Sequence, residues 1–104
     1  MRVVARRPKA IRDIEDQWFY LLEHGGVGVA DRFLNAIEQT GALLLSSPEI
    51  GMPCHFERLQ AAEVRRFPIT LPFGRWILYY RPTERGISML RLVHGNRDRR
   101  GFVP

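Results

Sequence analysis

The sequence predicts an α+β domain in the order β-α-α-β-β-β, with a helical hairpin packed on one face of a small antiparallel sheet. Apolar residues recur every three or four positions in the first half of the chain, as in amphipathic helices. The second half instead contains short runs rich in branched and aromatic residues, as in strands. With 104 residues and no repeat, linker or low-complexity stretch, the chain is expected to form a single domain over residues 1–104.

The first half predicts a short strand and two helices. Val3-Val4-Ala5 is the strand, and Pro8 stands where proline is tolerated, in the first turn of a helix. Gly25-Gly26 is expected to end the first helix, and the second must stop before Pro48. The two apolar stripes comprise Ile11, Ile14, Trp18, Leu21 and Leu22 in the first helix and Ala30, Phe33, Ile37 and Leu44 in the second.

The second half predicts a loop followed by three strands. Residues 48–60 are expected to form the loop, because two prolines and a glycine interrupt any helical or strand periodicity of the apolar residues. A five-residue connection that ends in Gly86 fits a hairpin loop between the last two strands. The three strands are expected at residues 64–69, 76–81 and 87–94.

Neither of the last two strands has a purely polar face, whereas a half-solvated antiparallel sheet normally alternates cleanly. Strict alternation in the last strand would place Ile87, Met89, Arg91 and Val93 on one face and Ser88, Leu90, Leu92 and His94 on the other. Since two helices cover only one side, part of the second face should be exposed and completed by a partner. Two of five residues are expected on this exposed face: Ile77, Leu78, Tyr79, Leu90 and Leu92.

The charge of the chain favours an anionic partner. Sixteen basic against eleven acidic residues give a net charge of +5, and Lys9 is the only lysine. The arginine side chain offers a planar donor fork that suits carboxylate and phosphate. A GC-rich genome would produce the same arginine bias, so composition alone does not identify the partner.

Cys54 is the only cysteine, so no intramolecular disulfide is possible, and no window is apolar enough for a membrane span. A cytoplasmic protein without membrane contact is therefore expected. The neighbouring His55 suggests a metal site, but no ligand pair recurs, so neither a metal nor another cofactor is expected.

Two strand residues are candidates for chemistry. His94 carries an imidazole, which suits acid–base work, although a strand-end histidine that hydrogen-bonds the turn at Gly95 is the more ordinary interpretation. Arg65 shares the strand parity of Phe67 and Ile69, so it is expected to be a buried, paired group that holds the sheet rather than a partner-facing one.

Six stretches stand in a specific order and spacing. They are the helix opening Pro8-Lys9-Ala10-Ile11-Arg12-Asp13-Ile14, the second-helix residues Ala30-Asp31-Arg32-Phe33, the exit Ser47-Pro48-Glu49-Ile50-Gly51, and the strand sequences Val64-Arg65-Arg66-Phe67-Pro68-Ile69, Trp76-Ile77-Leu78-Tyr79-Tyr80-Arg81-Pro82 and Leu90-Arg91-Leu92-Val93-His94-Gly95-Asn96-Arg97-Asp98. Almost end to end, the chain thereby resembles the ParE branch of the ParE/RelE toxins, the toxin halves of bacterial type II toxin–antitoxin pairs. Two departures from the family pattern are Pro53-Cys54-His55-Phe56, in place of a charged loop, and Thr70-Leu71-Pro72-Phe73-Gly74.

The resemblance implies a toxin that poisons DNA gyrase by stabilising the broken-DNA state, whereas RelE-like relatives cut mRNA in the ribosomal A site. Cleavage through the RNA 2′-hydroxyl needs proton transfer and stabilisation of the phosphorane charge. RelE-like enzymes supply both with a lysine and arginine cluster and a C-terminal tyrosine. Here Lys9 lies in the first helix, no tyrosine follows Tyr80, and Ile77 replaces the usual strand arginine. Only one residue of this chain, Arg97, is an obvious counterpart to a member of that RelE-like set.

The chain is therefore expected to inhibit DNA gyrase by binding, to arrest growth and stabilise plasmids, and to be neutralised in a hetero-oligomer by a cognate antitoxin. An acidic antitoxin segment that folds on binding would lie across the open sheet face and the hairpin. The expected contacts to target or antitoxin are Arg91, Arg97, Arg99, Arg100, Tyr79 and Arg81. For Arg97, Arg99 and Arg100 the alternative is a solvated tail without a binding role. The alternatives in function are a degenerate copy that only binds its antitoxin and a metal-independent, ribosome-dependent mRNA endonuclease built on Arg65, Arg75, Arg97 and His94.

Overall fold

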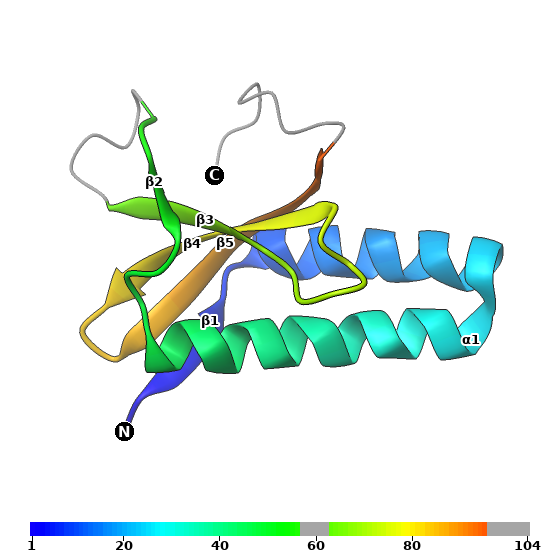
Figure 1. Ribbon diagram of the computed structural model, residues 1–104, viewed down its shortest axis with the longest axis horizontal. Coiled ribbons are helices and arrows are strands. Elements are labelled where there is room, and N and C mark those ends of the chain that lie inside the picture. The colour runs from blue at the N-terminus through cyan, green and yellow to red at the C-terminus, as the bar shows by residue number, and fades with distance from the viewer. Residues whose placement is uncertain (57–62, 96–104) are drawn as a thin grey trace.

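The computed structural model describes residues 1–56 and 63–95, which form a helical layer and a five-stranded sheet (Figure 1). The elements are β1 (Val3–Arg6), α1 (Pro8–Ser46), β2 (Met52–Cys54), β3 (Val64–Pro68), β4 (Trp76–Thr83) and β5 (Gly86–His94). The α+β class is as predicted. Within these ranges no helix is both long enough and apolar enough to cross a membrane.

The helical layer is a hairpin that turns at Gly26. The backbone of this residue has a φ of 86° and a ψ of 172°, which lie outside helical space and favour glycine. In Figure 1 the two segments of α1 run side by side in opposite directions. The predicted hairpin is confirmed, together with its start at Pro8 and its end before Pro48.

The sheet is mixed, with the strand order β1-β5-β4-β3-β2. Strands β3, β4 and β5 are antiparallel neighbours, as predicted, and β2 adds a further antiparallel strand, but β1 runs parallel to β5. The long α1 separates β1 from the other strands, so no tight turn dictates its direction. The prediction of a loop over residues 48–60 is wrong at β2, where Pro53 is tolerated because β2 is an edge strand.

A bulge in the pairing of β4 with β5 changes which residues face the hairpin. The register shifts between Tyr79 and Tyr80, which leaves Leu90 as an extra residue on β5. The strict alternation predicted for the last strand is therefore wrong beyond this point, because Met89 and Leu92 both face the hairpin. The core between the layers contains Ala10, Ile14, Phe33, Ile37 and Leu44 from α1 and Leu78, Tyr80, Ile87, Met89 and Leu92 from the sheet.

Most of the apolar residues on the second face of the sheet are buried as well, and Ile77 is partly buried. The buried cluster on this face consists of Val64, Tyr79, Leu90 and Val93, each 9% exposed or less. Phe56 packs against it, with its ring centroid 6.0 Å from that of Tyr79. The expectation of an exposed apolar face is therefore wrong for Tyr79 and Leu90, because part of the segment predicted as a loop covers them. It is wrong for Leu78 and Leu92 because these side chains face the hairpin.

Candidate functional site

The ends of β4 and β5 bring together residues that are far apart in the sequence. His94 lies opposite Trp76 in the strand pairing, and the two rings meet edge to face with centroids 4.9 Å apart. The amide of Gly95 donates to the carbonyl of Arg75, which places the exposed Arg75 beside the strand end. Trp76 Nε1 donates to Gln17 Oε1 at 2.9 Å and ties this corner of the sheet to α1.

Asp13 covers the edge of β5 that β1 leaves open. β1 pairs with β5 only as far as Met89, and farther along the amide of Leu92 donates to Asp13 Oδ2 at 3.0 Å. Arg91 binds the same carboxylate twice, with Nε donating to Oδ2 at 2.6 Å and Nη2 to Oδ1 at 3.1 Å. The Arg91 and Asp13 side chains are only 21% and 16% exposed, so water and salt screen the pair less than a surface pair. One carboxylate thus joins the start of α1 to the final strand.

Arg65 holds the turn that follows α1. Its Nη1 donates to the carbonyls of Glu49 and Gly51, at 2.9 and 2.8 Å. Its Nε and Nη2 approach Glu63 Oε1 to 2.7 and 2.6 Å. The Arg65 side chain is 16% exposed, so the predicted arginine is paired as expected but only partly buried.

The Tyr80 hydroxyl lies inside the same turn. It donates to the Pro48 carbonyl at 2.7 Å and accepts a hydrogen bond from the Gly51 amide at 3.0 Å. Burial raises the pKa of the Tyr80 phenol, against the smaller opposing effects of the Gly51 hydrogen bond and the Arg65 charge. A Cβ at position 51 would overlap the Tyr80 hydroxyl and ring, so the site requires glycine.

The predicted nuclease residues do not converge in the described part of the chain. Arg75 and His94 adjoin the end of β4 that begins at Trp76. Arg65 instead pairs with Tyr80, four residues farther along β4. At the usual rise of a strand, Tyr80 is about 13 Å from Trp76. The Arg65 guanidinium is also bound to the turn. The fourth member of the set, Arg97, lies outside the described residues.

The predicted binding residues lie in three different environments. Tyr79 is fully buried, so it offers no surface to a partner in this conformation. Arg91 is held in the ion pair with Asp13, and Arg81 is exposed. The remaining three lie outside the described residues: Arg97, Arg99 and Arg100. The binding role of the set stays a prediction.

Sequence reasoning missed Asp13, Gln17 and Tyr80 as the residues that hold the strand end and the turn. In the sequence Asp13 stands out only as one of several negative charges near the start of a helix. The helix-opening motif contains it, and that motif is the one signal that marks it.

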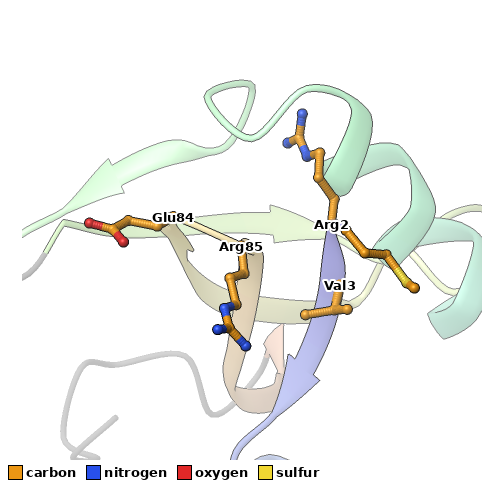
Figure 2. Close-up of a pocket in the computed structure, with 5 residues that line it drawn as sticks. Arg2, Val3, Glu84 and Arg85 are labelled. Atoms are coloured by element: carbon orange, nitrogen blue, oxygen red, sulfur yellow. The ribbon is translucent and has the colours of Figure 1, made fainter.

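The described residues hold no candidate metal cluster, and a hollow among them lies away from the candidate site. No group of three or more His, Cys, Asp and Glu side chains in residues 1–56 and 63–95 could hold a metal ion. A hollow of about 550 Å³ lies at the opposite end of β5 and is lined by Met1, Arg2, Val3, Glu84 and Arg85. Figure 2 shows the Arg2 and Arg85 side chains pointing apart, so their guanidinium groups do not converge on a common ligand.

The fold defines the class of protein as a small α+β domain in which a helical hairpin covers a mixed sheet. A family model described as the ParE toxin of the type II toxin–antitoxin system parDE matches residues 4–99. Because this match covers most of the chain, the chain belongs to that family, and it is the toxin component of a type II toxin–antitoxin system. No curated protein matches the chain.

The Asp13 contact should stabilise the fold more than an exposed ion pair does. Asp13→Asn removes the charge that binds Arg91 and should lower the free energy of unfolding by about 1.5–3 kcal/mol. Glu38→Gln is the matched control, because Glu38 is 73% exposed in its 2.8 Å pair with Arg6, and it should cost less than about 1 kcal/mol. Urea unfolding measures both values, and equal losses would contradict the role of Asp13.

The turn at Gly51 should not tolerate a side chain. Gly51→Ala forces a methyl group against Tyr80 and should destabilise the protein by about 1–3 kcal/mol. The control is Gly28→Ala, where the added Cβ would lie an ordinary 3.5 Å from Arg32 Nη1 and should gain about 0.5–1 kcal/mol of helix stability. Thermal unfolding of the two variants should show shifts of opposite sign.

Alkaline pH should weaken the fold through Tyr80. Its folded-state pKa lies above the ordinary value of 10.0, so the unfolded chain loses the phenolic proton first. The protonated Tyr80 phenol therefore adds to the free energy of unfolding. This contribution is complete below the ordinary pKa and is lost as pH rises through the folded-state pKa. The free energy of unfolding in urea should therefore fall more steeply above about pH 10 in the wild type than in Tyr80→Phe. Tyr20→Phe, at an exposed position, should keep the wild-type slope.

Proposed function

We propose that this toxin inhibits DNA gyrase by binding it and stabilising the broken-DNA state, without a chemical step of its own. Membership of the ParE family supports a gyrase target. The spacing of Arg65 from Arg75 and His94 supports a mode of action that needs no acid–base constellation. The observation that carries the proposal is that the Arg65 guanidinium is bound to two turn carbonyls and Glu63 rather than directed at the strand end.

The partner that neutralises the toxin is a cognate antitoxin, as membership of the family implies. In our proposal the antitoxin contributes an acidic segment that folds on binding and forms a hetero-oligomer with the toxin in the cytoplasm. The net charge of +5 supports an acidic partner segment. Binding to the folded toxin alone should also raise its melting temperature by mass action.

One observation favours the endonuclease alternative. Arg75 and His94 are brought to the same strand end, where a cation and an imidazole together would suit attack on a phosphodiester. A functional test must therefore separate binding from proton transfer.

His94→Gln should keep most of the inhibition of gyrase supercoiling, because a toxin that acts by binding has no use for a general base. Replacing Arg97, Arg99 and Arg100 with Ala should abolish inhibition, because it removes cationic contacts to the target. Supercoiling and DNA-cleavage assays with purified gyrase measure both variants, and circular dichroism checks that they are folded. A dead but folded His94→Gln, together with wild-type cleavage of ribosome-bound mRNA, would move the protein to the RelE-like class.

A further inference from the structure

The turning end of the helical hairpin extends beyond the sheet. Trp76 reaches α1 by its hydrogen bond to Gln17, and Phe33 contacts Trp76 and Phe73 with ring centroids 5.3 and 5.4 Å away. Farther toward the turn, α1 runs past the strands (Figure 1). From Gln17 to Gly25 the helix advances about 12 Å at its usual rise. We call residues 15–31, which include the two residues just before Gln17, the hairpin tip.

The hairpin tip exposes large apolar side chains. Phe19, Tyr20 and Val27 are 56%, 53% and 62% exposed. Two of the rings are held by neighbours, with Phe19 edge-on to Trp18 at 5.1 Å and Tyr20 stacked on His24 at 4.3 Å. Held rings lose less side-chain entropy when a partner covers them, and aromatic side chains dominate the energy of protein interfaces.

The hairpin tip is acidic, although the chain as a whole is basic. It contains no lysine or arginine, and its four carboxylates, Glu15, Asp16, Glu23 and Asp31, are all exposed. The other residues of the chain contain all sixteen cations and only seven of the eleven acidic residues. Counted with Arg32, whose guanidinium lies beside Gly28, the tip presents a charge of −3 on a chain of +5, with its histidine neutral.

From this combination we infer that the hairpin tip is a docking surface for the target protein, which meets it with an apolar patch surrounded by lysine or arginine. The inference rests on the proposed action by binding, and it names the surface through which the toxin would engage its target. Exposed aromatic groups provide the apolar contact, and the four carboxylates provide complementary charge that selects a basic partner and steers its approach.

The charge of the hairpin tip disfavours other partners. DNA and an acidic antitoxin segment carry the same sign of charge and would be repelled. A second copy of the chain could place its basic surface on the tip, but such a head-to-tail contact joins unlike surfaces and leads to open chains unless a ring closes. A basic surface on the target remains the occupant that the charge and the exposed rings favour.

The test compares Phe19→Ser/Val27→Ser with a control that removes exposed apolar surface elsewhere. Leu71→Ser is the matched control, because Leu71 is 88% exposed and lies outside the hairpin. The tip variant should need at least about tenfold more toxin than the wild type to arrest growth, since truncated anchor residues at interfaces commonly cost that much affinity. Its affinity for the antitoxin and its melting temperature should match those of the wild type, and Leu71→Ser should retain full toxicity.

A second variant, Glu15→Gln/Glu23→Gln, changes only charge at exposed helix positions and keeps the test valid if the first variant fails to fold. It should also weaken growth arrest, whereas Glu84→Gln, outside the tip, should not. Full toxicity of both folded tip variants would overturn the inference. Equal loss of antitoxin affinity, or self-association of the wild type that the tip variants abolish, would also overturn it. Growth arrest that depends on the tip while purified gyrase is unaffected would refute the gyrase target and leave the role of the tip intact.

Discussion

The contact of Asp13 with the final strand holds the two ends of the described chain together. Asp13 lies in the first turns of α1, yet its carboxylate binds the side chain of Arg91 and the amide of Leu92, 78 and 79 residues away. The contact lies where β1 stops pairing, so it replaces a missing strand neighbour with a charged acceptor. It thereby sets the position of the strand end that carries His94. Because the pair is shielded, loss of either partner would leave a partly buried charge unmatched.

A second set of polar contacts fixes the turn after α1. The hydroxyl of Tyr80 and the guanidinium of Arg65 together engage Pro48, Glu49 and Gly51 through their backbone groups. These two side chains face the hairpin side of the sheet, where an apolar residue would otherwise be expected. These contacts explain why proline and glycine stand at fixed positions after the helices. The turn must present its carbonyl groups to Arg65, and Gly51 must leave room for the Tyr80 ring.

Much of the fold could be predicted from the sequence, because the helices and the three longer strands have strong periodic patterns of their own. The glycine turn at Gly26 and the structural role of Arg65 also follow from local chemistry, the first from backbone freedom and the second from strand parity. The parallel placement of β1 and the bulge at Leu90 depend on long-range pairing, which no local pattern encodes. The covered second face depends on Phe56, in a segment whose prolines favour a loop. The contact of Asp13 with Arg91 joins residues too distant for periodicity to connect them.

These features describe a toxin whose Arg91 is engaged in an internal ion pair and whose Arg65 stabilises a turn. Its helical hairpin projects an acidic, aromatic tip. They favour a protein that acts by stoichiometric binding. The most direct measurement is a time course with gyrase and, separately, ribosome-bound mRNA, in which the toxin is present well below the concentration of its target. Inhibition of gyrase should reach a plateau set by the ratio of toxin to enzyme, and mRNA should stay intact. Continued accumulation of cleaved mRNA, in amounts exceeding the toxin present, would contradict it.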